Sequence, residues 1–199
     1  MSTPDFTKHF TVDHDHLQRL HLRLERDAQA GDLLDIAYRT VDSAVGPLLL
    51  AATPRGLLRV AFAHEGYDNV LQNLSGRISP RILEAPTRLD PIARQLDEYF
   101  AGGRQSFDVA LDWSLSHGFR RTVLEHLNTD IRYGATTSYA ELAQLSGSPK
   151  AVRAVGTACA TNPIPIVVPC HRVIRSDGAV GAYRGGPAAK RVLLDLERP

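Results

Sequence analysis

The sequence predicts a two-domain α/β (α+β) protein, in which a small domain of sheet plus helix precedes a mostly helical domain. Between residues 35 and 112, short apolar runs alternate with glycine and proline turns, and two helical stretches follow them. From residue 117 to 199 the pattern is helical, with short turns. The chain has 199 residues and is 43% hydrophobic, which is enough to bury a core in one or two small domains.

Residues 1–34 are expected to form an N-terminal extension whose role the sequence does not assign. Its main feature is a helix over residues 12–30, because Leu17, Leu20 and Leu24 recur at the spacing of one helical face. Gly31 is suited to end that helix.

Residues 35–112 are expected to form the α/β domain. Its elements in order are strands over 35–41, 46–52 and 56–63, helices over 65–76 and 87–101, and a short strand over 107–111. The turn Pro54-Arg55-Gly56 between two apolar runs is typical of a hairpin. Gly102-Gly103 ends the second helix.

Charge is distributed unevenly between the two halves. Residues 117–199 carry 11 Lys and Arg against 6 Asp and Glu, whereas the whole chain has a net charge of +1. A basic C-terminal half beside an acidic N-terminal half indicates a polyanionic partner that meets one face.

Residues 138–160 have the pattern of a helix-turn-helix. Ser138 is placed to cap a helix that runs to Leu145 and ends at Gly147. Ser148 would cap the second helix, with Pro149 at its first position, where a missing N–H costs nothing. Many short helix pairs have this pattern, so it does not by itself indicate DNA binding.

The second helix of this pair has a predicted inner face. Val152, Val155 and Cys159 are spaced by three and four residues, so we expect them to pack inward. Arg153 falls outside that face.

Cys170 is the strongest candidate for a reactive residue. It follows the run Asn-Pro-Ile-Pro-Ile-Val-Val-Pro, whose prolines stiffen the backbone, and it precedes His171 and Arg172. Neighbours that carry positive charge or accept protons favour thiolate over thiol. These residues alone leave two readings open, a nucleophile in a shaped pocket and a small core hydrophobe.

Longer motifs extend around this cysteine. They are Pro169-Cys170-His171-Arg172-Val173, the stretch from Ser138-Tyr139 through residues 148–156, and residues 181–186 leading into a helix that ends at Glu197. At these spacings the chain resembles the O6-alkylguanine-DNA alkyltransferases, closely over 117–199 and more loosely over 35–112. The resemblance implies a ribonuclease H-like N-terminal domain and a winged-helix-like C-terminal domain, and it does not cover the first 34 residues.

The resemblance also implies the roles of the catalytic residues. Cys170 would accept the alkyl group, His171 would activate it through a bridging water, and Glu197 would hold His171. We expect Asn162 to bond local backbone in the turn before the cysteine. Arg172 has two candidate roles, lowering the thiol pKa or forming an ion pair across the domain interface, of which the second is favoured.

The same resemblance implies how DNA is bound. Arg153 would fill the gap left by a flipped nucleotide, and Tyr139 would assist rotation of its phosphate. We expect the second helix to lie in the minor groove of double-stranded DNA. The other residues expected on this surface are Ser138, Ala151, Ala154 and Gly156.

A pocket for the flipped base is expected beside the cysteine. Its predicted lining is Val168, Val173, Tyr183, Arg184, Gly185 and Gly186. Relatives often have a small residue where this chain has Arg184, which would either narrow the pocket or point toward phosphate. The terminal helix, over 187–197, is expected to dock through Ala189, Val192, Leu193 and Leu196.

The implied function is direct-reversal repair, as a methylated-DNA–protein-cysteine methyltransferase. The alkyl group of O6-alkylguanine would pass irreversibly to Cys170. The sequence does not decide whether O4-methylthymine is also a substrate or which sizes of alkyl group are preferred. Two alternatives are a lesion-binding protein without transfer and a thiol-responsive helix-turn-helix regulator. We expect a monomer.

No metal or other cofactor is expected. His9, His14, His16 and His21 have no cysteine partner and match no common ligand spacing, so they are interpreted as solvated helix residues. Two cysteines do not suffice for a four-cysteine zinc site. The first residues lack the layout of a signal peptide, no run is long enough to span a membrane, and a reactive thiol requires reduction, so a cytoplasmic location is expected.

Overall fold

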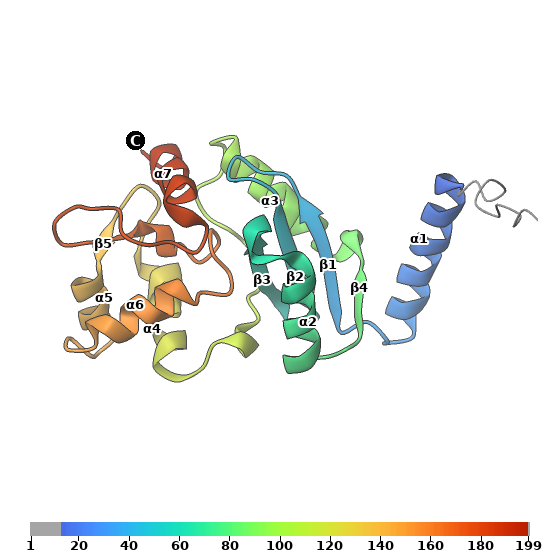
Figure 1. The fold of residues 1–199 in the computed structure, drawn as a ribbon, viewed down its shortest axis with the longest axis horizontal. Helices are drawn as coiled ribbons and strands as arrows, with labels where there is room; N and C mark the ends of the chain where they lie inside the picture. The colour runs from blue at the N-terminus through green and yellow to red at the C-terminus, as the bar shows by residue number, and fades with distance from the viewer. Residues whose placement is uncertain (1–12, 199) are drawn as a thin grey trace, which may run out of the picture. The chain divides into compact units, whose positions relative to one another are not determined.

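The computed structural model describes residues 13–198, and the chain divides into two compact units between Leu34 and Asp35. The second unit contains a sheet-plus-helix part followed by a helical part, as predicted (Figure 1). Its main elements in order are β1 (Ile36–Val41), β2 (Leu48–Thr53), β3 (Gly56–Phe62), α2 (Tyr67–Arg77), β4 (Ile82–Glu84), α3 (Asp90–Phe100), α4 (Gly118–Asp130), β5 (Thr137–Ser138), α5 (Tyr139–Leu145), α6 (Val152–Ala160), β6 (Val173–Ile174) and α7 (Gly186–Leu196).

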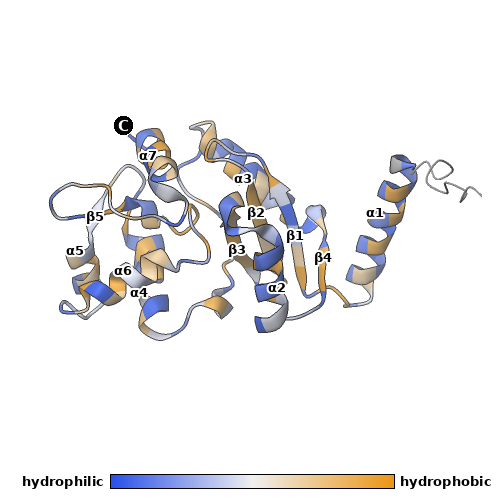
Figure 2. Cartoon of the chain, viewed as in Figure 1, coloured by the Kyte–Doolittle hydropathy of each residue, from blue (hydrophilic) through white to orange (hydrophobic). Residues whose placement is uncertain are grey.

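The first unit contains the expected helix, α1 (His14–Ala30). The Asp13 carboxylate accepts a hydrogen bond from the His16 N–H at 3.1 Å and so caps the helix, and Gly31 ends it. Leu17, Leu20 and Leu24 are about half exposed. Figure 2 shows hydrophobic and polar residues alternating along this helix.

A four-stranded sheet forms the first part of the second unit. Its order is β3-β2-β1-β4, with β1 antiparallel to β2 and parallel to β4. All six residues of β2 are buried, so both faces of the sheet are covered. Figure 1 shows α2 in front of the sheet and α3 behind it.

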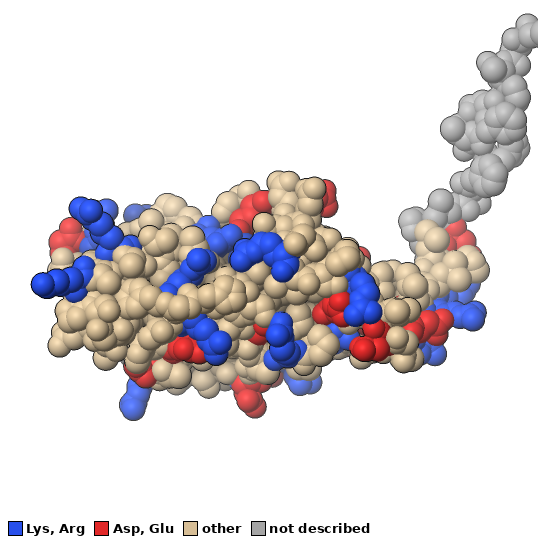
Figure 3. Space-filling model, turned by 90° about the horizontal axis from the view of Figure 1, so that it is seen from below, with Lys and Arg blue, Asp and Glu red and all other residues tan. Residues whose placement is uncertain are grey.

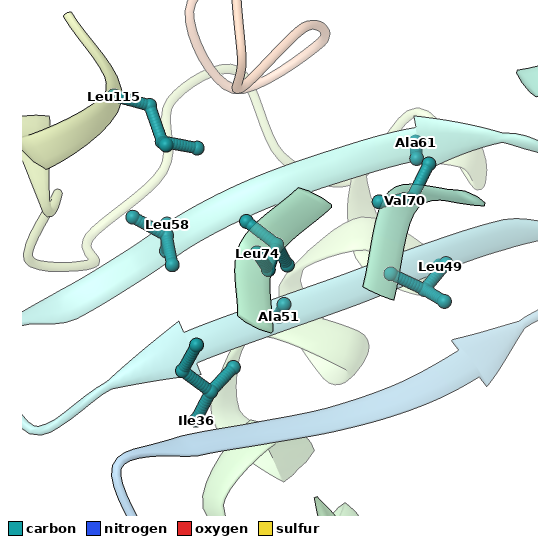
Figure 4. Packing of buried hydrophobic residues seen from close by; sticks show 8 residues of the cluster. All are labelled: Ile36, Leu49, Ala51, Leu58, Ala61, Val70, Leu74 and Leu115. Atoms are coloured by element: carbon teal, nitrogen blue, oxygen red, sulfur yellow. The ribbon is translucent and has the colours of Figure 1, made fainter. Parts of the chain in front are cut away.

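The core beneath α2 is built from alternate strand residues. Leu49 and Ala51 of β2 point to the same face, where they meet Val70 and Leu74 of α2 (Figure 4). Leu115, just before the helical part, closes one end of this cluster. The core of the sheet domain therefore extends to the segment that leads into α4.

The strand expected over 107–111 is wrong. Only an isolated bridge forms, between Leu57 and Leu111, with the Leu57 N–H donating to Ala110 O at 2.8 Å and the Asp112 N–H donating to Leu57 O at 2.9 Å. The two segments lie so close together that a Cβ on Gly56 would be only 2.2 Å from Ala110 O. Glycine is required there, and the pairing does not extend beyond this crossing.

The helical part begins with α4, and α4, α5 and α6 pack on one another. The predicted cap of α5 is confirmed, since the Glu141 N–H donates to Ser138 Oγ at 3.1 Å and the Ser138 N–H donates to the Glu141 carboxylate at 2.7 Å. Strands β5 and β6 pair in parallel, Thr137 opposite Val173, which places the start of α5 beside the cysteine segment.

The predicted start and inner face of the second helix need correction. The helix α6 begins at Val152 and has no side-chain cap, because the backbone carbonyl of Ser148 accepts a hydrogen bond from the Ala151 N–H at 2.8 Å in a turn. Neither Ser148 nor Pro149 therefore belongs to the helix. Val152, in the first turn of the shortened helix, is 39% exposed. The buried face consists of Val155, Ala158 and Cys159.

The terminal helix also differs from its expected face. Ala189 and Leu193 are buried as predicted, but Val192 is 39% exposed and Leu196 is half-buried. Lys190 is fully buried in their place. No helix in the part of the chain that the structure describes is long and apolar enough to cross a membrane.

Candidate active site

Cys170 lies at the start of a single helical turn, Cys170–Arg172, and its side chain is 3% exposed. Its backbone N–H donates to Val168 O at 2.8 Å, and its Sγ accepts a hydrogen bond from Asn162 Nδ2 at 3.1 Å. A bond from an amide N–H favours the thiolate over the thiol. The sulfur is therefore held in one position by a neighbouring side chain.

Asn162 also fixes the loop that carries the cysteine. Its Nδ2 donates to Val168 O at 2.8 Å, and its Oδ1 accepts from the Ile164 N–H at 3.0 Å. The loop is tight enough that Ile166 adopts φ 76°, a left-handed conformation that is costly for a β-branched residue. Asn162 thus bonds local backbone, as expected, and reaches the sulfur as well.

Burial raises the pKa of Cys170 to about 11, and the bond from Asn162 and the charge of Lys190 oppose that rise only in part. The resting side chain is consequently a thiol at neutral pH. Reaction requires a base to take the proton as the sulfur attacks.

His171 is fully buried, and its Nε2 lies 2.9 Å from Glu197 Oε1. Burial lowers the pKa of His171, with Glu197 acting in the opposite direction. Among the described residues, His171 Nδ1 has no hydrogen-bond partner. In the neutral tautomer that donates from Nε2 to the carboxylate, Nδ1 is the nitrogen free to accept a proton.

Glu197 organises a buried cluster of four polar side chains, although it ends the helix only two residues before the end of this sequence. It is 2% exposed and accepts hydrogen bonds from Tyr99 Oη at 2.7 Å and from Arg172 at 2.8 and 2.9 Å, in addition to the contact with His171. Burial opposes its ionisation, but the bonds from His171 and Arg172 outweigh this effect and lower the pKa of Glu197 to about 2.

The favoured role of Arg172 is wrong in its detail. The guanidinium pairs with Glu197 and donates to Ile131 O at 2.6 Å, both inside the helical part, so it does not cross to the sheet domain. Within this cluster, the side chain that crosses between the domains is Tyr99, from α3 of the sheet domain. No local sequence signal links Tyr99 to Glu197.

Lys190 is a second residue that the sequence analysis missed. Its Nζ donates to Val173 O at 2.6 Å, just beyond the cysteine turn. Burial lowers the pKa of Lys190, while Cys170 and Cys159 favour its charged form. Its side chain therefore places positive charge inside the site. In the sequence, Lys190 looks like any polar residue on the outer face of a terminal helix.

The predicted pocket residues gather beside the cysteine. Val168 and Val173 are fully buried, and Tyr183 is 9% exposed with its ring edge-on to His171, 6.2 Å between centroids. A Cβ on Gly185 would lie 2.5 Å from the Phe62 ring of β3, so this glycine lets the pocket loop reach the sheet domain. Gly186 begins α7 directly after it.

Arg184 forms an ion pair that neither expectation included. Its Nε and its Nη2 lie 2.8 and 2.7 Å from Glu65 Oε2, so the side chain is tied to the sheet domain. Glu65 also pairs with buried Arg59. Glu65 therefore holds the Arg184 guanidinium against the sheet domain.

The predicted DNA-binding residues lie along α5 and α6. Arg153 and Ala154 are exposed on α6, Gly156 and Ala151 are half-buried, and Tyr139 is half-buried at the first position of α5. Burial raises the pKa of Tyr139. Its hydroxyl would lie 3.4 Å from a Cβ on Gly181, next to the loop that leads to the pocket.

The structure describes only part of the group of N-terminal histidines. His9 lies outside the described residues, as does the side chain of His14. In the part that the structure describes, no group of three or more His, Cys, Asp and Glu side chains is placed to hold a metal ion.

The fold and site together define a two-domain protein with a helix-turn-helix and a buried thiol beside a His–Glu pair. Two family models match the chain, "6-O-methylguanine DNA methyltransferase, ribonuclease-like domain" over residues 36–113 and "6-O-methylguanine DNA methyltransferase, DNA binding domain" over residues 118–199. The chain belongs to this 6-O-methylguanine DNA methyltransferase family.

Individual relatives agree with this assignment. A methylated-DNA–protein-cysteine methyltransferase of Mycolicibacterium paratuberculosis is 42% identical over 163 residues, which cover 82% of this chain and 93% of the relative. A constitutive one of Bacillus subtilis is 37% identical over 165 residues, covering 81% and 94%. The crystal structure of the O6-methylguanine methyltransferase of Mycobacterium tuberculosis matches with a TM-score of 0.70 and 40% identity over 82% of this chain and 93% of that one.

A Mycobacterium tuberculosis protein named OGT has been crystallised in complex with DNA. That structure matches with a TM-score of 0.69 and 40% identity, covering 81% of this chain and 92% of the other. These matches confirm the family resemblance and the two-domain fold predicted from the sequence.

Proposed function

We propose that this protein repairs DNA by direct reversal, moving the alkyl group of O6-alkylguanine from the base to Cys170 Sγ in one irreversible step. The family assignment supports alkyl transfer from DNA to a cysteine. The observation that carries the choice of Cys170 is its thiol, held by Asn162 in a turn that continues directly into His171. The other cysteine, Cys159, lies on the packed face of α6.

In the proposed step, a bond forms between Sγ and the alkyl carbon as the bond from that carbon to O6 breaks. The thiol proton passes to His171 Nδ1, by way of a water as in the family, and the guanine released regains a proton. Glu197 is ionised and accepts from Nε2, so it favours the tautomer in which Nδ1 is a base. The thioether product offers no easy leaving group, and each molecule acts once.

The target atom lies inside the base stack, so the nucleotide has to rotate into the pocket beside Tyr183. We assign Arg153 to the gap left in the duplex and Tyr139 to the rotated phosphate. Ala154 is exposed and Gly156 is half-buried, and neither has a bulky side chain. The outer face of α6 can therefore approach a minor groove closely. Minor-groove docking suits a protein that must find its lesion in any sequence, because this groove carries little sequence information.

The remaining assignments follow the same account. We propose a sheet domain over 35–112, a DNA-binding and acceptor domain over 117–199, and a monomeric protein. Both cysteines are free thiols, which supports a location in a reducing compartment such as the cytoplasm.

A transfer assay on duplex DNA containing O6-methylguanine tests this function. Wild-type protein should remove one methyl group per molecule and then stop, and Cys170→Ser should bind the duplex within a few-fold of wild type but remove none. Binding of the lesion by wild type without methyl loss would instead support a lesion-binding protein. A change in DNA binding after chemical modification of the thiol, without any repair, would support a thiol-responsive regulator.

A further inference from the structure

A cleft of about 400 Å³ separates the sheet domain from the helical domain, away from the cysteine. One wall is α2, which contributes Asn73 and Arg77. The opposite wall is formed by Arg120, in the first turn of α4, and by Thr161, directly after α6. The cleft thus lies between α2 of the sheet domain and the α4 and α6 region of the helical domain.

The arginine side chains that line the cleft carry more positive charge than the one carboxylate among the lining residues can neutralise. Arg59 and Arg184 share the carboxylate of Glu65, whose pKa is lowered because these bonds outweigh its burial. Arg77 and Arg120 are exposed, and neither guanidinium group has a hydrogen bond or ion pair with a described residue. Four guanidinium groups against one carboxylate leave a clear excess of positive charge facing the cavity.

The cleft also continues the surface assigned to DNA. Thr161 follows the last residue of α6, the helix that carries Arg153, and Arg120 belongs to α4, which packs against α6. Figure 3 shows basic side chains recurring along the face of residues 35–198 that lies below in Figure 1. DNA lying along α6 would therefore pass the mouth of the cleft.

We propose that this cleft binds a backbone phosphate of the DNA held by α6, so that α2 of the sheet domain takes part in DNA binding through Arg77. A guanidinium offers the planar fork of donors that suits a phosphate, and the amide of Asn73 adds a neutral donor beside it. Contacts to phosphate position a duplex without reading its sequence. This inference rests on the proposed function, because it requires DNA on α6.

Fluorescence anisotropy with a labelled, unmodified duplex over a range of salt concentrations tests the inference. Arg77→Gln should weaken binding about five- to tenfold at about 0.1 M salt and reduce the slope of log affinity against log salt by about one. The matched control is Arg94→Gln, an exposed arginine on α3, on the other face of the sheet, which removes the same charge. Its salt slope should equal that of wild type.

Equal slopes for Arg77→Gln and Arg94→Gln would overturn the inference, once urea denaturation has shown both variants to be folded. A shift of wild-type unfolding by inorganic phosphate that Arg77→Gln abolishes, with duplex affinity unchanged, would also overturn it in favour of a free-phosphate site. Reaction of wild type with free O6-benzylguanine tests the proposed function separately, because that small substrate does not need the cleft.

Discussion

Replacing Glu197 by glutamine removes the charge at the centre of the buried cluster while keeping its shape. The wild-type carboxylate accepts hydrogen bonds from Tyr99 and Arg172 and lies 2.9 Å from His171 Nε2. Glutamine keeps one acceptor oxygen, but its amide cannot accept, so Arg172 loses its counter-charge in a buried place. Breaking a buried ion pair from one side typically costs about 3–5 kcal/mol.

The pKa of Glu197 gives a similar magnitude. A folded value of about 2 against the ordinary 4.5 corresponds to about 3 kcal/mol of stability near neutral pH. Because the folded pKa is the lower one, this stability is present above about pH 4.5 and is lost as the pH falls toward 2. For a domain of this size the cost corresponds to a fall of about 6–12 °C in Tm.

Urea denaturation of wild type and Glu197→Gln, at about pH 7 and again at about pH 3.5, measures both effects. At the higher pH, we expect the free energy of unfolding of Glu197→Gln to be about 3 kcal/mol below that of wild type. At the lower pH, this difference should be smaller by about 1 kcal/mol. Asp195→Asn is the matched control, because the pair of Asp195 with Arg198 is exposed and its loss should change stability by less than about 0.5 kcal/mol. A Glu197→Gln protein as stable as the control, with the same pH dependence, would refute the reasoning.

Three further substitutions test other parts of the site. Arg153→Ala should slow repair of duplex DNA by about tenfold or more but leave reaction with free O6-benzylguanine unchanged, since only the duplex has a vacancy to fill; equal slowing of both rates would point to a role in the pocket or fold. Cys159→Ser should retain full methyl transfer, measured by the same assay, because its sulfur lies on the packed face of α6; a folded but inactive protein would contradict this. Arg184→Ser frees the pocket loop from Glu65 and should raise the benzyl-to-methyl rate ratio several-fold, with Arg191→Ser, an exposed arginine on α7, as control; an unchanged ratio would show that the ion pair does not limit adduct size.

The sequence predicts the parts of this site that depend on neighbouring residues. The cap of α5 by Ser138 follows from a local pattern, and it is present. The bond of Asn162 to nearby backbone is likewise a short-range contact, and it is confirmed. The contact between His171 and Glu197 came from the family resemblance, because a carboxylate near a chain end otherwise looks like a frayed surface residue.

Contacts that depend on the packing of distant segments were missed. Tyr99 reaches Glu197 across 98 positions and Arg184 reaches Glu65 across 119, and no periodicity records either pairing. The buried ammonium group of Lys190 depends on a partner that is distant in sequence, the carbonyl of Val173. The predicted start of α6 was also wrong, because residues 148–151 form a turn closed by the bond from the Ala151 N–H to the Ser148 backbone carbonyl.

Peptide mapping by mass spectrometry after complete reaction with an O6-methylguanine duplex tests the central claim most directly. We expect one added methyl group, on the peptide that contains Cys170, with fragment ions that place it on the sulfur and an unmodified Cys159 in the same sample. A methyl group on Cys159 or on any other residue, or repaired guanine with no modified peptide, would contradict it.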